Sequence, residues 1–208
     1  MILTMTPFAK DMNLGRAYND AMSLLGPGDW ACLLDHDVMF TTYDWNQQLE
    51  DAIAADPRGS FTGVTNRIHC PWQQAKEAGT ENHDIKHHRR VGAERLKNRD
   101  LLDVTSAVGW GGFLMLLSYD AWDESGGFVD GMLCVDHQMH FALRRAGRPV
   151  YLIEGLYMYH YKRAFGEKYV GAEARRAPIA LDRVTGQPCP RTCVKEKPWP
   201  DKMVRRTM

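Results

Sequence analysis

The tripeptide Asp35-His36-Asp37 follows the most apolar strand candidate of the sequence, residues 30–34. In an extended strand alternate side chains point to the same side, so the two carboxylates would share one face and His36 the other. Such a pair at the end of a buried strand can hold a divalent cation, and the cation can bind a diphosphate. Asp37 is the favoured metal ligand, and Asp35 would bind a ribose or the metal through water. The alternative is a polar turn after a core strand.

A second carboxylate that could do chemistry is Asp136, at the start of a predicted helix. The helix dipole favours its ionised form, and partial desolvation in a cleft would let it accept a proton from a hydroxyl group. The alternative is an aspartate that only caps the helix. His140, one turn later on the same helix, would either line the cleft or be solvated.

His160 lies among alternating aromatic residues after the last predicted strand. Imidazole joins oxygen ligands readily on Mn²⁺-like ions, so His160 is a candidate third metal ligand. The alternative is a packed or surface histidine. Lys162 and Arg163 beside it could balance the charge of a leaving diphosphate.

Two further polar segments have less specific patterns. The basic, histidine-rich residues 83–90 could clamp phosphate as a lid, although a solvated charged loop is favoured. Cys189 and Cys193 could pair or bind metal, but two incidental thiols in a loose tail are favoured because no second cysteine pair has zinc-site spacing. Cys32 and Cys134 are expected to be core thiols.

The composition is that of an ordinary globular protein. The chain has 208 residues, 44% of them hydrophobic, and its 26 Lys and Arg residues balance 26 Asp and Glu residues. No global charge therefore favours nucleic acid or an anionic membrane as a partner. No apolar stretch is long enough to span a bilayer, and Met1 opens into no signal-peptide pattern. We expect a reduced, cytoplasmic protein.

The elements that must position these residues alternate between strands and helices, which predicts a three-layer α/β sandwich with a mostly parallel central sheet. Residues 1–163 would form the catalytic domain and residues 164–208 an irregular C-terminal extension, wrapped or partly disordered. Residues 69–100 would be a mobile insertion with helical pieces. The expected strands are residues 2–5, 30–34, 61–66, 104–118 and 150–153, and the expected helices are residues 13–25, 44–55 and 136–145.

The order and spacing of these motifs over residues 1–163 resemble the Rossmann-like A-type glycosyltransferase fold, and most closely its family 2 group. The resemblance implies that the Asp-x-Asp pair binds the metal and the nucleotide sugar, and that a late histidine completes the metal site. It also implies a catalytic base at the start of the later helix. Carried over, these roles give Asp35, Asp37 and His160 as metal ligands, Asp136 as base, Asp35, Gly111 and Gly112 at the donor and acceptor pocket, and Asn13, Gly15 and Asn19 facing the nucleotide.

The implied reaction is transfer of a sugar from a nucleotide-diphosphate sugar, with a UDP-sugar favoured, to a glycan or other hydroxyl acceptor. The cofactor would be Mn²⁺ or Mg²⁺, and the anomeric configuration would be inverted. Two departures leave alternatives open: only one short strand precedes the helix at residues 13–25, and Val135 stands where relatives have a second acidic residue. The alternatives are a metal-dependent nucleotidyltransferase or phosphodiesterase, and a non-catalytic nucleotide-sugar-binding or glycan-binding relative.

Overall fold

The structure is a computed structural model that describes residues 1–161, 178–187 and 204–207. Within these residues the chain forms a mixed, eight-stranded sheet in the order β1-β2-β6-β4-β7-β5-β8, with β3 paired to β7. The α/β class is confirmed, but a mostly parallel sheet is not, because among the described strands only the β1–β2 and β4–β7 pairs are parallel. The strands are β1 (Ile2–Met5), β2 (Trp30–Leu34), β3 (Val38–Phe40), β4 (Ser60–Thr65), β5 (Asp100–Asp103), β6 (Leu114–Ser118), β7 (Val150–His160) and β8 (Arg205–Thr207).

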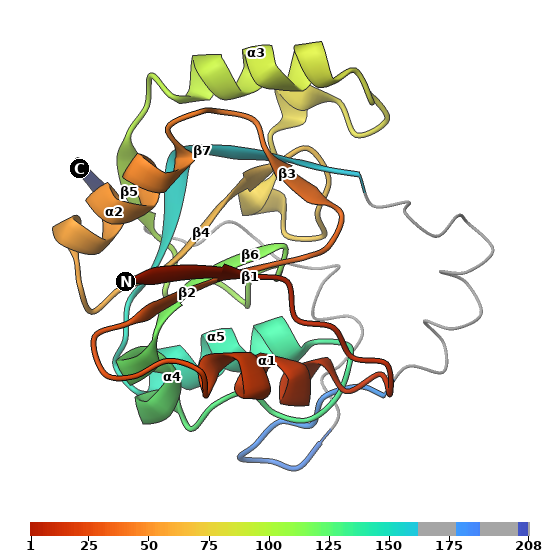
Figure 1. Ribbon diagram of the computed structural model, residues 1–208, viewed down its shortest axis with the longest axis vertical. Coiled ribbons are helices and arrows are strands. Elements are labelled where there is room, and N and C mark those ends of the chain that lie inside the picture. Colours follow the sequence, from red (N-terminus) through yellow and green to blue (C-terminus); the bar gives the residue numbers. More distant parts are fainter. Residues whose placement is uncertain (162–177, 188–203, 208) are drawn as a thin grey trace.

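Helices lie on both sides of this sheet. Figure 1 shows α1, α4 and α5 together on one side, α2 on the other, and α3 beyond β7. Each side has its own cluster of buried apolar residues, so the sheet is the middle layer of the core. The helices are α1 (Leu14–Met22), α2 (Trp45–Ala55), α3 (Ile85–Arg95), α4 (Tyr119–Ser125) and α5 (Val135–Arg145), with short 3₁₀ turns η1 (Pro71–Gln73) and η2 (Lys76–Ala78).

Strand direction explains where the site forms. Strands β1, β2, β4 and β7 run the same way, because β6 is antiparallel to both β2 and β4 and the other two pairs are parallel. Their carboxyl ends therefore meet at one edge of the sheet, on the right in Figure 1. Open α/β sheets bind ligands outside the carboxyl ends of their strands. The segments that follow β1, β2 and β4, and the last residue of β7, all lie at this edge.

Two strands differ in extent from the sequence expectation. β7 has 11 residues, against an expected 150–153, and His160 is its last residue and does not follow the strand. The expected strand 104–118 is shorter, because only Leu114–Ser118 pairs with β2 and residues 104–113 form a loop. Its glycines suit a loop, since Gly109 has φ +75°.

Residues 69–100 pack against the body of the protein and do not form the mobile insertion that the sequence predicts. The expected helical pieces are present, and Trp72, His88 and Val91 are buried. His88 fixes α3 to the sheet through hydrogen bonds of 2.7 Å with the Tyr157 hydroxyl and with the Asn82 carbonyl oxygen. The segment shows no clean apolar period because polar side chains make part of this contact.

The described parts of the C-terminal extension pack on the body of the protein. The carbonyl of Pro178 accepts from the backbone N–H groups of Met132 and Leu133, at 2.8 and 3.1 Å, and β8 pairs with β5. Cys189 and Cys193 lie outside the described residues. In the described part of the chain, no helix has both the length and the apolar character that crossing a bilayer requires.

Candidate active site

Asp35, His36 and Asp37 form the connection between β2 and β3. Asp35 and Asp37 are both partly buried, and His36 is exposed. The three residues lie in a turn and are not an extension of the strand, so strand alternation does not place the carboxylates. The turn is held at both ends: the N–H of Asp35 donates to the Phe113 carbonyl at 3.1 Å, and the N–H of Tyr161 donates to the Asp37 carbonyl at 2.9 Å.

The structure brings the three predicted metal ligands together. Asp35, Asp37 and His160 each offer one ligand atom, and these atoms lie within 4.8 Å of one another. Nε2 of His160 is 3.2 Å from Oδ1 of Asp37. The pairing of β3 with the end of β7, Val38 opposite His160, places the histidine next to the turn. Two sequence-distant motifs therefore meet at the carboxyl edge of the sheet.

The two carboxylates have opposite pKa shifts. Burial raises the pKa of Asp35 to about 6, and the nearby charges of Asp37 and Asp136 also raise it, whereas His160 lowers it. Burial alone would raise the pKa of Asp37, but the hydrogen bond and charge of His160 bring it below its ordinary value. Asp37 is thus the ionised partner of His160, and Asp35 is the carboxyl group that gains most from a further positive charge.

The donor set fits a divalent cation. Two carboxylates and an imidazole suit Mn²⁺, and carboxylates also suit Mg²⁺. Nδ1 of His160 is buried and has no hydrogen-bond partner among the described residues, so the ring is not committed at both nitrogens.

Asn66 is a residue of this edge that the sequence expectations missed. It follows β4 directly and is fully buried. Its Oδ1 accepts from the backbone N–H of His160 at 2.8 Å, while its Nδ2 has no partner among the described residues. The available signal was its position, immediately after an apolar strand, as for Asp35.

A cavity of about 390 Å³ adjoins the metal-binding residues, and Asp35 and Asp136 both line it. Gly111 and Gly112 form part of its wall, as expected. Tyr18 also lines the cavity; burial, then the charges of Asp35 and Asp136, raise the pKa of its hydroxyl well above the ordinary value. The cavity is therefore lined by Asp35 of the candidate metal site, by the candidate base Asp136 and by the protonated hydroxyl group of Tyr18.

Asp136 lies in the first turn of α5, and Cys134, with φ +65°, is the residue at the N-cap position. Its Oδ2 accepts from the N–H of Gly112 at 2.8 Å, and its Oδ1 accepts from the N–H of His137 at 2.9 Å. The indole N–H of Trp110 donates to the Asp136 carbonyl at 2.9 Å. The close contact between residue 112 and Asp136 requires glycine, because a Cβ at residue 112 would lie only 2.9 Å from the Cβ of Asp136. The carboxylate is therefore held in one orientation.

The α1 residues expected to face a nucleotide have structural contacts. Oδ1 of Asn13 accepts from the N–H groups of Arg16 and Gly131, both at 3.1 Å. Asn19 accepts from the Phe128 N–H at 2.8 Å and donates to the Phe128 carbonyl at 2.9 Å. A Cβ at Gly15 would overlap the carbonyl oxygen of Val129. These residues fix the loop that leads to the cavity wall, and their role toward a nucleotide stays a prediction.

Of the remaining residues considered from the sequence, His140 and His83 do not line the cavity, whereas Cys134 does. His140 is buried, with Nε2 3.2 Å from the Thr105 carbonyl oxygen and its ring against Trp110, and it does not line the cavity. His83 lies 2.7 Å from the Tyr159 hydroxyl, so it helps to anchor the α3 segment. Cys134 is half-buried and lines the cavity, unlike the buried core thiol Cys32. Lys162 and Arg163 lie outside the described residues.

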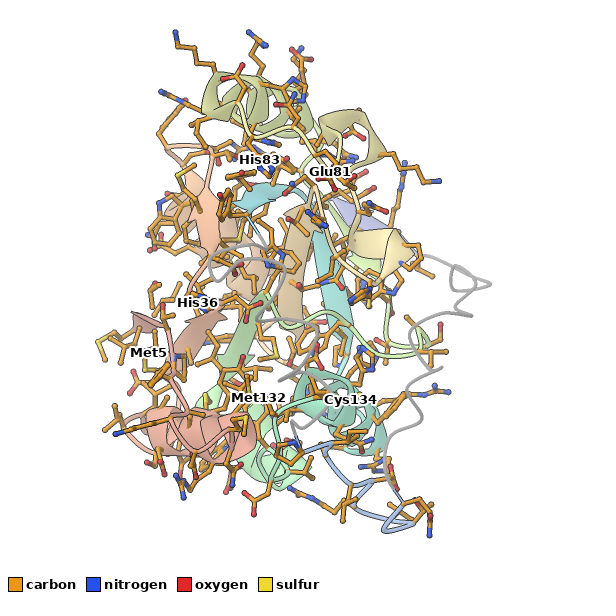
Figure 2. All side chains as sticks on the ribbon, turned by 90° about the vertical axis from the view of Figure 1, so that its right-hand side faces the viewer. Met5, His36, Glu81, His83, Met132 and Cys134 are labelled. Atoms are coloured by element: carbon orange, nitrogen blue, oxygen red, sulfur yellow. The ribbon has the colours of Figure 1, made fainter. Side chains whose placement is uncertain are left out.

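Figure 2 shows the labelled residues around this site on one side of the molecule: His36 in the turn, Met5 at the end of β1, and Met132 and Cys134 before α5. No protein-family model matches the sequence, and no curated protein matches it significantly. Function is therefore inferred from the geometry of these residues.

Proposed function

We propose that this chain is a metal-dependent glycosyltransferase that moves a sugar from a nucleotide-diphosphate sugar to an acceptor hydroxyl. The observation that carries the proposal is the convergence of Asp35, Asp37 and His160 beside a cavity that Asp35 shares with Asp136. A site for the diphosphate and a group that can accept a proton are thus adjacent. The A-type fold and the family 2 likeness belong to the same proposal, and the convergence of motifs supports them.

Asp35, Asp37 and His160 would hold the Mn²⁺ or Mg²⁺ ion. When bound, this ion supplies positive charge that stabilises the leaving diphosphate. The UDP-sugar preference and the contacts of Asn13, Gly15 and Asn19 with a nucleotide remain part of the proposal. The Asn13 and Asn19 side chains also bond the loop at residues 128–131, so they position that loop as well.

Asp136 would take the proton of the acceptor hydroxyl as that oxygen attacks the anomeric carbon. Each of its carboxylate oxygens already accepts one backbone N–H and retains capacity for another donor. A single displacement, in which the acceptor oxygen attacks opposite the departing diphosphate with Asp136 as base, would invert the anomeric configuration. Tyr18 stays protonated and can donate a hydrogen bond to the bound sugar or acceptor.

The test is the variant Asp136→Asn, which keeps the shape of the side chain and removes the base. Sugar transfer from a labelled donor should fall by at least about a hundredfold, as expected for loss of a general base. Asp123→Asn is the matched control, because Asp123 is an exposed helical aspartate away from the cavity. Full transfer activity in Asp136→Asn would rule out this base.

Analysis of the products of the same reaction distinguishes a glycosyltransferase from a nucleotidyltransferase or phosphodiesterase. Release of free or transferred sugar supports the glycosyltransferase, whereas release of a nucleoside monophosphate would indicate a nucleotidyltransferase or phosphodiesterase.

One observation favours a non-catalytic relative as the second candidate. Both oxygens of Asp136 accept backbone hydrogen bonds, an arrangement that also suits a purely structural aspartate at the start of a helix. This candidate would bind the donor, with heat released in calorimetry, and show neither transfer nor hydrolysis over long incubation.

A further inference from the structure

The cavity beside Asp136 has an apolar wall. Leu14, Ile68, Met132, Leu133 and Cys134 contribute to it. Its volume of about 390 Å³ is at the lower end of the range for small-molecule sites, roughly 300–1,000 Å³. Such a volume accommodates a compact ligand that touches the apolar wall and the carboxylates at once.

Two backbone donors in the cavity wall are already paired within the protein. The N–H of Gly112 donates to Asp136, and the N–H of Gly111 donates to Oε1 of Gln73 at 2.6 Å. A ligand hydroxyl group that meets only the apolar side chains would lose its water without gaining a hydrogen-bond partner, which is unfavourable. A glycan carries several hydroxyl groups on each ring and would incur this cost repeatedly.

The polar side chains that line the cavity with this wall are those of Tyr18, Asp35, His69, Asp136 and His137. Asp35 belongs to the metal site, and Asp136 is held by the glycine loop. In Figure 2, Met132 and Cys134 of the apolar wall lie on the same side of the molecule as His36 of the metal turn. Because Asp136 and the apolar wall line the same cavity, a ligand can present one hydroxyl group to Asp136 while the rest of it contacts aliphatic and sulfur-containing side chains.

We infer that the acceptor carries its reacting hydroxyl on an apolar group, an alkyl or aryl alcohol, and is not a polyhydroxylated glycan. The inference rests on the proposed function. In the reaction the acceptor O–H bond breaks and its proton passes to Asp136. The oxygen bonds to the anomeric carbon, and the bond between that carbon and the diphosphate oxygen breaks, with its electron pair leaving on the diphosphate.

Ligand-observed NMR on the metal-free protein tests the preference directly. Hexan-1-ol, benzyl alcohol, glycerol and methyl glucoside would be compared at equal concentrations. Binding of either apolar alcohol, with no detectable binding of the two polyols, supports the inference, and the better of the two identifies an alkyl or an aryl source. Polyol binding equal to or stronger than that of both alcohols would overturn it.

The variant Leu133→Gln places an amide in the apolar wall, and Leu24→Gln is its control, because Leu24 is 74% exposed in the turn after α1. Alcohol binding should weaken on the order of tenfold in Leu133→Gln, since a leucine contact is worth at least about 1.4 kcal/mol. It should be unchanged in Leu24→Gln. Met132→Gln gives the same test if Leu133→Gln does not fold. Unchanged binding in a folded wall variant contradicts the inference.

Cleavage of a labelled UDP-sugar by water, with Mn²⁺ and no acceptor, reports on the proposed function alone. Alcohol binding without donor cleavage or transfer would contradict the glycosyltransferase and leave the preference of the cavity in place. Donor cleavage together with a preference for polyols would contradict the acceptor inference and leave the glycosyltransferase in place.

Discussion

Asp37 and His160 are in direct contact in the candidate metal site. Their contact of 3.2 Å joins the β2–β3 turn to the end of β7, and the hydrogen bond lowers the pKa of Asp37. A bound cation would stabilise the ionised form of Asp35 most, because the pKa of this carboxyl group is raised. The two carboxyl groups of the site therefore differ in pKa, and His160 contacts the one with the lower pKa.

His88 is the residue for which the structure predicts a pH dependence of folding. Its Nε2 faces a carbonyl oxygen and must donate, so its Nδ1 accepts from the Tyr157 hydroxyl and the ring is neutral. Burial lowers its pKa. The hydrogen bond with Asn82 opposes this shift, and the neighbouring histidines add to it. The unfolded chain, with a pKa of about 6.5, then binds the proton more readily than the folded chain.

The stabilising contribution of neutral His88 is thus complete above about pH 6.5 and is lost as the pH falls below it. Urea unfolding at pH 7.5 and pH 5.5 compares the wild type with His88→Gln, in which residue 88 cannot titrate. Asp35, whose raised pKa acts in the opposite direction, contributes equally to both proteins, so the wild type should lose more free energy of unfolding, or gain less, on acidification than His88→Gln. An equal difference in wild type and His88→Gln would show that His88 does not titrate on unfolding.

Helix α1 positions the cavity wall more than it offers ligand groups. Asn13 and Asn19 hydrogen-bond the segment at residues 128–131, and Gly15 lets the helix touch the Val129 carbonyl. The N–H of Gly15 also donates to the Gly131 carbonyl at 3.1 Å. Met132, which lines the cavity, follows directly, so the packing of this helix is linked to the shape of the site.

The variant Gly15→Ala tests this packing. Glycine to alanine in a helix ordinarily stabilises by up to about 1 kcal/mol, through helix propensity. Here the added Cβ meets a backbone carbonyl that cannot turn away, so we expect destabilisation of roughly 1–3 kcal/mol in urea unfolding. Asp20→Ala, at the exposed side of the same helix, should be neutral or stabilising. A stabilised Gly15→Ala would contradict the close contact.

At the level of elements, local patterns predicted the existence of most strands and helices, and missed what depends on distant partners. The strand at residues 30–34 and the helix at residues 44–55 were found because their apolar patterns are local. The apolar, glycine-containing sequence of residues 104–118 predicts one strand, but residues 104–113 form a loop whose glycines are fixed by Gln73 and Asp136 from other segments. α1 ends at Met22, earlier than the expected Leu25.

For the molecule as a whole, the site could be predicted where a functional side chain lies at a strand end or helix start. Asp35, Asp37, Asp136 and His160 were found in this way, and the structure places the first two and His160 together. Asn66 was missed, although it lies at the same edge, because a single amide after a strand has no chemical signature. The mixed strand directions were also missed, since alternation of elements does not specify how β6 enters the sheet.

The most direct test of the central claim is calorimetric titration of the protein with a UDP-sugar, once with Mn²⁺ and once with EDTA. The account predicts binding that requires Mn²⁺ in the wild type, is lost in Asp37→Ala and is retained in Asp123→Ala, whose exposed carboxylate lies outside the site. Binding of equal strength in EDTA, or binding in Mn²⁺ that Asp37→Ala leaves intact, would contradict a metal-dependent nucleotide-sugar site at Asp35, Asp37 and His160.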